Sequence, residues 1–162
     1  MSEPLKVLQA PPSRSYQHAA GLGFVGLVLG LVVATGIIFW QYRLVTPVSE
    51  AFLVAQTPIM QHRSEKGIWP ADFDLTLPPE AVGLYGYGPA RAAVMKAGVP
   101  GVWRFMNRGA EGGPAIVFTP ASWDEDVRRL LESVDDRVDD GRPDSGRFRL
   151  GAGRASFTLR AD

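Results

Sequence analysis

One stretch of the chain, from Ala19 to Trp40, contains no charged side chain and almost no polar one. A helix rises about 1.5 Å per residue, so a helix of this length can cross the roughly 30 Å hydrocarbon core of a bilayer. Five of its residues are glycines, which weaken a buried helix in water by roughly 0.5–1 kcal/mol each but are common in membrane spans. We therefore expect residues 19–41 to form one transmembrane helix.

A cleaved secretory signal is the alternative interpretation of this stretch. Its apolar run is longer than the roughly 7–15 residues of a usual signal, and FWQYR at its end offers no small-x-small cleavage site. An uncleaved anchor is therefore favoured. Residues 1–18 combine two prolines with several serines and read as a mobile tail or leader. Lys6 and Arg14 precede the anchor, whereas Arg43 and Glu50 after it cancel, which favours a cytoplasmic N-terminus and an exported C-terminal part.

The composition narrows the classes of function. The residues after the anchor are enough for one small domain with its own core. Lys plus Arg and Asp plus Glu both number 17, so charge gives no reason to expect nucleic acid as a partner. The chain has no cysteine and only two histidines, so thiolate chemistry is excluded and the commonest catalytic base is scarce. We expect a protein that is not an enzyme and has no small-molecule substrate.

A second helix is predicted directly after the anchor, over residues 46–67. Thr46 and Pro47 suit its N-cap and first helical position, which predicts a break or kink near Val45. Pro58 should bend this helix, and Gly67 suits its C-terminal end. One face repeats apolar side chains at helical spacing, which predicts an amphipathic packing face: Val48, Phe52, Ala55 and Ile59.

Residues 68–162 read as an α+β domain. Prolines and glycines predict an irregular connection over residues 70–101, with a short helix over 91–97 and tyrosines 85 and 87 used for packing or a subunit contact. Residues 101–107 and 115–119 alternate as an antiparallel hairpin, and residues 147–150 and 155–160 as a second one. Between the hairpins, Ser122 and Glu125 have capping-box spacing before a helix over 123–137.

An acidic loop, VDDRVDDGRPDSG, runs from Val134 to Gly146. Its carboxylates make it a weak candidate for Ca²⁺, with these residues as ligands: Asp136, Asp139, Asp140 and Asp144. An EF-hand that starts at Asp136 fails, because Val138 stands at its third position and Arg147 at its twelfth, where a glutamate is needed. Aspartate also favours turns without any metal, and neighbouring arginines can neutralise it. We therefore predict no cofactor, with calcium as the open alternative.

The order of a short leader, an apolar helix continued by an amphipathic one, and a small antiparallel sheet resembles bacterial type IV pilins and type II secretion pseudopilins. The likeness is carried by PVSEAFLVAQTPIMQHRSEKGIWPAD, from Pro47 to Asp72, with its VSEA stretch and its GIWP exit, and more loosely by the acidic loop. The resemblance implies a pilin-like fold, in which the two N-terminal helices form a spine packed on the sheet. It also implies a bacterial inner-membrane protein with a periplasmic or exported domain.

The leader motif of that family is incomplete here. Prepilin peptidase cuts between a glycine and a phenylalanine, which Gly23 and Phe24 match, but Leu22 stands where a basic residue is expected. Val28 stands where the family has a glutamate that pairs with the N-terminus of a neighbouring subunit. The chain thus departs from the family at two of the positions that leader cleavage and assembly use there.

Two functions are consistent with these features. The first is a non-enzymatic pilin or pseudopilin-like subunit whose partners are the membrane and other such subunits or secretion components. Its helices would then pack through the amphipathic face above and through small residues that let a second helix approach: Gly26, Gly30 and Ala34. The second is a stand-alone membrane-anchored binding or scaffold protein that does not polymerise, which the valine at position 28 favours.

Overall fold

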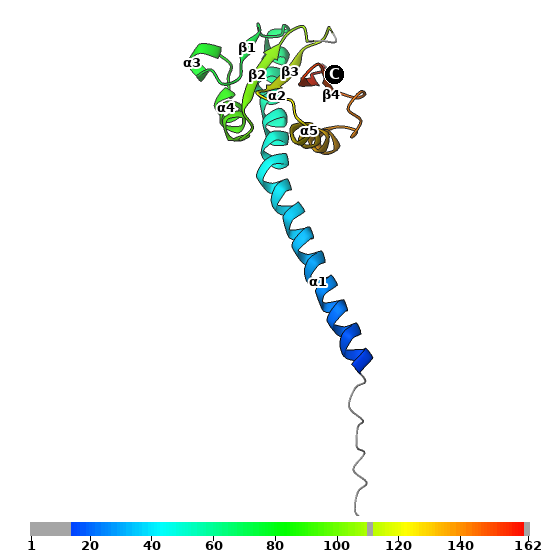
Figure 1. The fold of residues 1–162 in the computed structure, drawn as a ribbon. Coiled ribbons are helices and arrows are strands. Elements are labelled where there is room, and N and C mark those ends of the chain that lie inside the picture. The colour runs from blue at the N-terminus through cyan, green and yellow to red at the C-terminus, as the bar shows by residue number, and fades with distance from the viewer. Residues whose placement is uncertain (1–13, 110–111, 161–162) are drawn as a thin grey trace, which may run out of the picture. The chain divides into compact units, whose positions relative to one another are not determined.

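The computed structural model of the chain describes residues 14–109 and 112–160. It has the predicted α+β class, with a long helical N-terminal region, a five-stranded antiparallel sheet and several shorter helices (Figure 1). The chain divides into two compact units, Met1–Phe39 and Trp40–Asp162. We call the second unit the C-terminal domain.

The N-terminal helical region consists of α1 (Arg14–Trp40), a π-helical turn η1 (Gln41–Val45) and α2 (Thr46–Lys66). Helix α1 begins before the apolar stretch, so residues 14–18 of the predicted tail are helical, which corrects that prediction. No proline or glycine occurs between Arg14 and Ala20, so nothing in this segment opposes a helix. The rest of the predicted tail, residues 1–13, lies outside the described part of the chain.

The predicted break or kink near Val45 takes the form of a π-helical turn, η1, across which the helical backbone continues without a break. Val45 itself has helical backbone angles, φ −63° and ψ −47°, and no side chain caps the start of α2. Pro47 has no N–H and its ring crowds the preceding turn, so a proline at this place needs a locally wider helix. The π-helical turn before it provides that width, and the hydroxyl of Ser49 donates a hydrogen bond to the Val45 carbonyl at 2.8 Å.

The C-terminal end of α2 agrees with the prediction. Gly67 takes the left-handed conformation, with φ 74°, and its N–H donates to the carbonyl of Arg63. Glycine adopts this conformation without the steric cost of a Cβ, which explains why the helix stops there. Pro58 lies inside α2, which continues across it to Lys66.

Five strands form the sheet: β1 (Phe73–Asp74), β2 (Gly101–Met106), β3 (Ala115–Pro120), β4 (Phe148–Gly151) and β5 (Arg154–Thr158). Their order is β1-β2-β3-β5-β4 and all neighbours are antiparallel. Both predicted hairpins are therefore confirmed, as β2-β3 and β4-β5. Since Trp103 pairs with Phe118 and Phe157 with both Ile116 and Phe148, alternate residues place aromatic side chains on one face of the sheet.

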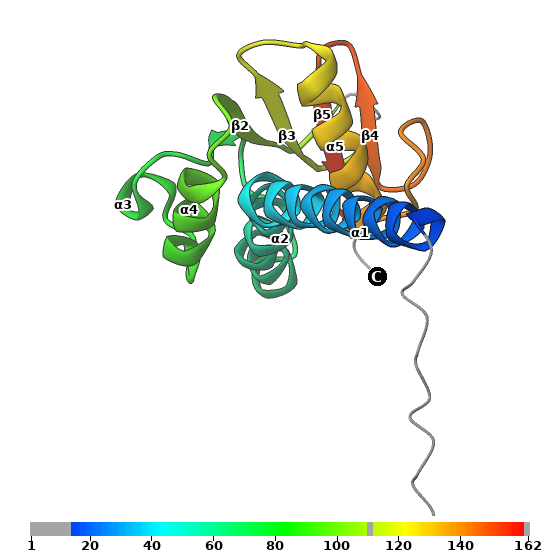
Figure 2. The same ribbon diagram turned by 60° about the horizontal axis from the view of Figure 1, so that its bottom comes forward.

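This aromatic face packs on α2. Phe52 lies with its ring centroid 4.7 Å from that of Trp103 and 5.0 Å from that of Phe148, and the Phe148 ring meets it edge-on. Helices α4 and α5 lie on either side of α2, as both ribbon views show (Figures 1 and 2). Small side chains at Ala51, Ala55 and Ala90 are fully buried, which lets α2 and α4 approach closely.

The segment between α2 and β2 is more regular than predicted. It contains β1, a one-turn helix α3 (Pro79–Val82) and α4 (Tyr87–Lys96), so the helix expected over 91–97 starts four residues earlier. The two tyrosines differ, since Tyr87 is buried and Tyr85 is 81% exposed. The predicted packing role thus holds for Tyr87.

Helix α5 (Glu125–Val138) follows β3, close to the predicted range. Its N-cap is Asp124 rather than Ser122: Asp124 Oδ1 accepts a hydrogen bond from the N–H of Val127 at 2.9 Å. The Ser122 hydroxyl instead donates to the other carboxylate oxygen of Asp124. The predicted capping box is therefore wrong, because a carboxylate one residue before the helix is a stronger acceptor for its free N–H groups. These two hydrogen bonds lower the pKa of Asp124, the one from Val127 contributing most.

Candidate functional site

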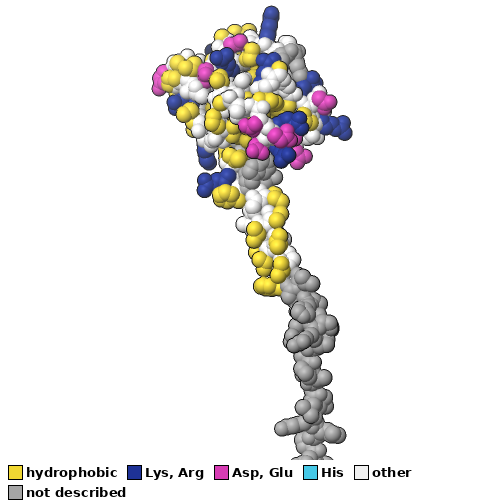
Figure 3. Space-filling model, viewed as in Figure 1, with side chains coloured by type: hydrophobic (Ala, Val, Ile, Leu, Met, Phe, Trp, Pro, Cys, Tyr) yellow, Lys and Arg dark blue, Asp and Glu magenta, His cyan; other side chains and the backbone are white. Residues whose placement is uncertain are grey.

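The residues singled out in the sequence lie in two places, the apolar helix α1 and the acidic loop after α5. In α1, the side chains of residues 24–39 are all exposed in the structure of the chain. The helical region that begins at Phe24 has a mean hydropathy of 2.1 over its most apolar 18 residues and is, by length and composition, able to cross a membrane. Figure 3 shows apolar side chains along this stretch with no charged one among them.

Three small residues of α1 share one helix face, as predicted. Among the described residues, no atom lies within 4 Å of the place a Cβ would occupy at Gly26 or Gly30, and Ala34 is exposed. The predicted cleavage position, Gly23–Phe24, lies inside α1; Phe24 is 69% exposed, and the surroundings of Gly23 are outside the described part. This face of α1 is therefore open to another helix.

The packing face predicted in α2 is covered within the chain itself. Each of its four residues, Val48, Phe52, Ala55 and Ile59, is fully buried in the core of the C-terminal domain. The structure thus separates the predicted packing residues into two sets. Those of α1 are exposed, whereas those of α2 contact the domain's own sheet and helices.

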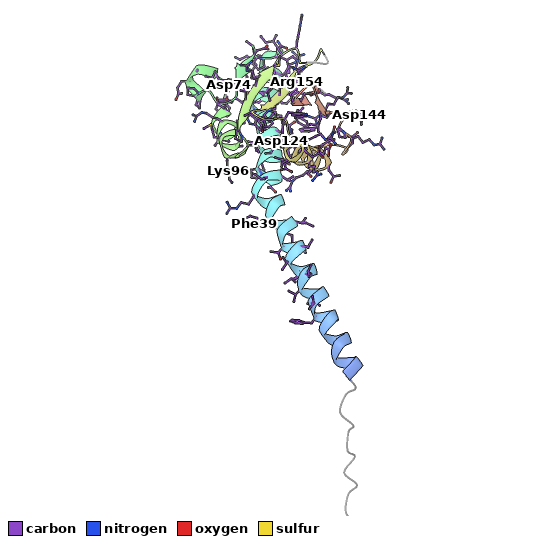
Figure 4. The ribbon with its side chains drawn as sticks, viewed as in Figure 1. Phe39, Asp74, Lys96, Asp124, Asp144 and Arg154 are labelled. Atoms are coloured by element: carbon purple, nitrogen blue, oxygen red, sulfur yellow. The ribbon has the colours of Figure 1, made fainter. Side chains whose placement is uncertain are left out.

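The acidic loop brings together carboxylates that differ from the predicted set. Asp139 and Asp140 meet Asp135, and one ligand oxygen from each lies within 4.8 Å of those of the other two. We call these three residues the acidic cluster. Asp136 and Asp144 are exposed and lie outside it, and Figure 4 shows Asp144 at the outer edge of the domain. Sequence spacing held a signal for Asp135, because it lies four residues before Asp139, one turn back on the same helix face.

Asp139 and Asp140 are held in place by hydrogen bonds. Oδ2 of Asp139 accepts from the backbone N–H groups of Arg147 and Phe148, the latter at 2.8 Å, which leaves its Oδ1 for another partner. Asp140 accepts from the backbone N–H of Arg142 at 3.0 Å and from the hydroxyl of Ser145 at 2.9 Å. The Ser145 hydroxyl and then the Arg142 N–H lower the pKa of Asp140, because they favour its charged form.

Asp135 has different surroundings. Its side chain is fully buried in the last turns of α5, and neither carboxylate oxygen forms a hydrogen bond within the described residues. Burial raises the pKa of Asp135 to about 6, and the charges of Asp140 and Asp139 add to this, while the N–H of Gly141 acts in the opposite direction. A buried carboxylate without a partner is costly, so this side chain needs a proton or a cation.

Gly146 closes the loop around the acidic cluster. It has φ +68°, and a Cβ at this position would overlap with Oδ2 of Asp139 and approach the carboxylate carbon of Asp140 to 3.1 Å. Glycine is thus required both by the backbone angle and by the close approach of the carboxylates.

The arginines that flank the cluster in the sequence direct their guanidinium groups elsewhere. Arg147 donates to the carbonyl of Thr158 and to the side chain of Gln56, and its guanidinium carbon lies 4.5 Å from the centre of the Phe157 ring. Arg137 donates to the hydroxyl of Thr46. The sequence left open whether arginine side chains neutralise the loop. Arg137 and Arg147 do not take this role, because their guanidinium groups bind elsewhere.

Two shallow hollows lie on the surface of the C-terminal domain. The first, of about 370 Å³, lies beside the β4-β5 hairpin and contains Asp144, Arg149, Arg154 and Ser156. The second, of about 310 Å³, lies along β1 and β2 and contains Asp72, Asp74 and Arg104. Neither hollow is lined by a histidine or lysine that would activate a nucleophile.

Comparison of the chain with models of protein families, with curated proteins and with solved structures found no match. The function therefore has to be inferred from the residues of the chain itself.

Proposed function

We propose that this protein is a non-enzymatic, membrane-anchored subunit of a pilin-like or type II secretion-like assembly. In this proposal α1 lies in the bacterial inner membrane and packs against the corresponding helix of another subunit. The N-terminus is cytoplasmic and the C-terminal domain is periplasmic or exported. Contact between subunits, rather than chemistry, is then the function of the chain.

The exposure of α1 carries this proposal. Residues 24–39 are predominantly apolar, uncharged and exposed, whereas the apolar face of α2 is already buried in the core of the C-terminal domain. Exposed apolar surface of this size on a soluble monomer would promote aggregation, so a lipid bilayer or other helices must cover it. Gly26 and Gly30 give the helix a face without bulky side chains, and close approach of backbones is what drives helix association in lipid.

Disulfide crosslinking of single cysteines tests the proposal, because the natural chain contains no cysteine. The variants Gly26→Cys and Gly30→Cys place a thiol on the small-residue face, where a new Cβ has free space. At about 3.6 residues per turn, Val28→Cys and Val32→Cys place it on the opposite face and serve as matched controls. In native membranes we expect disulfide-linked pairs for the first two variants and few for the controls. Equal crosslinking of all four, or none at all, would contradict assembly through this face.

A stand-alone anchored binding protein is the second candidate. Val28, which stands where the pilins that the chain resembles carry a glutamate, is 43% exposed and apolar, so it does not supply the intramembrane charge that sets their register. The mass of the mature protein separates the two candidates. A chain that begins at Phe24 supports the pilin-like subunit, and an intact N-terminus together with an absence of crosslinks supports the stand-alone protein.

A further inference from the structure

The acidic cluster contains a carboxylate that the protein alone does not satisfy. Asp135 is fully buried, and both of its oxygens lack a hydrogen bond within the described residues. Buried ionised groups in proteins are paired or bind a metal, since an isolated charge in a low-dielectric interior is strongly unfavourable. The buried carboxylate of Asp135 therefore indicates a bound cation, independently of the clustering of the three aspartates.

The loop holds the two other carboxylates close to Asp135. Asp139 is fixed by the N–H groups of Arg147 and Phe148, and Asp140 by Arg142 and Ser145. The three ligand oxygens lie within 4.8 Å of one another, at the C-terminal end of α5, where the helix dipole adds further negative potential. Three like charges held this close repel one another unless a cation lies between them.

We propose that Asp135, Asp139 and Asp140 bind one hard divalent cation, with calcium as the ion that fits best. The donors are all oxygen atoms, and the chain has no cysteine, so zinc and copper are disfavoured. Calcium accepts irregular sets of six to eight oxygens, whereas magnesium requires a near-ideal octahedron. Three carboxylates from one helix end and its loop suit the former, with water molecules in the remaining positions.

The bound cation would link the loop to the core. Asp139 holds the N–H of Phe148 at 2.8 Å, and the Phe148 ring lies 5.0 Å from that of Phe52 in α2. A cation between Asp135 and Asp139 therefore fixes the end of α5 to the first residue of β4. This inference concerns the C-terminal domain alone and does not depend on what covers α1.

Calcium titration of the full-length protein in detergent micelles, after removal of metal with EGTA, tests the site. By calorimetry we expect one Ca²⁺ per chain, with an affinity of about 10⁻⁴ to 10⁻³ M, as in extracellular calcium modules. Near saturation, at about one hundred times this dissociation constant, thermal unfolding should shift upward by roughly 10 °C. Mg²⁺ at the same concentration should give a smaller shift.

Isosteric variants separate the site from general charge effects. Asp135→Asn keeps the shape of the side chain and should abolish both the binding heat and the thermal shift. Asp136→Asn and Asp144→Asn remove one charge from the same loop outside the cluster and should leave both unchanged. If Asp135→Asn does not fold, Asp140→Asn provides the same test on an exposed ligand. Absence of binding in the wild-type protein, or binding that persists in Asp135→Asn, would overturn the proposal.

Discussion

Phe52 and Asp135 are both fully buried, yet their surroundings have little in common. Phe52 contacts three other aromatic rings, those of Trp103, Phe148 and Phe157. Each such contact contributes little by itself, and the stabilisation is shared among many neighbouring atoms. Asp135 belongs to a cluster in which the two other carboxylates accept hydrogen bonds from defined donors, whereas neither of its own oxygens forms a hydrogen bond within the described residues. The aromatic core thus stabilises the fold by burial, whereas the acidic cluster needs a specific partner.

Removal of a ring from the aromatic core should have the largest effect. We expect Phe52→Ala to lower the free energy of unfolding of the C-terminal domain by about 3–5 kcal/mol, because it leaves a cavity between α2 and the sheet. Leu53→Ala, at the neighbouring and 38% exposed position, should cost about 1 kcal/mol or less. Denaturant unfolding followed by tryptophan fluorescence measures both. Similar losses for the two variants would show that burial does not distinguish them.

The pH dependence of stability should reveal the acidic cluster. Because the pKa of Asp135 is raised to about 6 in the folded chain, the folded state holds more protons than the unfolded state between about pH 4 and 6. In EGTA, stability should therefore fall as the pH rises through this window, by about 3 kcal/mol. Asp135→Asn should lack this fall. Parallel pH profiles of the wild type and the variant would show that Asp135 has an ordinary pKa.

Alanine substitutions at Gly146, which closes the loop around the acidic cluster, and at Gly153 distinguish backbone strain from steric overlap. Gly146→Ala should destabilise the domain by about 2 kcal/mol, since alanine has both an unfavourable φ and a Cβ that displaces Asp139. Gly153→Ala is the matched control: its φ is +75°, but no atom lies within 4 Å of the new Cβ. It should cost about 1 kcal/mol. Chemical denaturation measures the free energy of unfolding of both variants. Equal losses would mean that the loop moves to make room for the Cβ of residue 146 without a further loss of stability.

The smallest effect is expected for an unpaired polar atom inside the aromatic core. The hydroxyl of Tyr87 is buried and has no hydrogen-bond partner among the described residues. Burial, followed by the charge of Asp74, raises the pKa of Tyr87 to about 12, so the group stays neutral. Tyr87→Phe should leave stability unchanged or increase it by up to about 1 kcal/mol. A clear loss of stability in thermal unfolding, against exposed Tyr85→Phe as the control, would show a partner for this hydroxyl.

Much of the architecture was predictable from local sequence patterns. Both hairpins follow from alternating β-rich runs separated by glycines, and the end of α2 follows from Gly67. These predictions succeed because periodicity and turn chemistry act over a few residues. The two predicted helix caps failed because a local pattern does not show at which residue a helix begins. Thr46 and Ser122 have side chains that suit a cap, but the cap positions are taken by Val45 and Asp124.

The uncharged apolar stretch of residues 19–40 and the aspartate-rich loop after α5 are visible in the sequence, because both are properties of composition. Which apolar faces remain uncovered, and which aspartates meet, depends on how the chain folds. Val48 and Gly26 looked alike as packing positions, yet Val48 is buried in the core of the C-terminal domain and Gly26 is exposed. Asp135 joins Asp139 and Asp140 in place of Asp136, because α5 turns its side chain inward and the fold removes it from water.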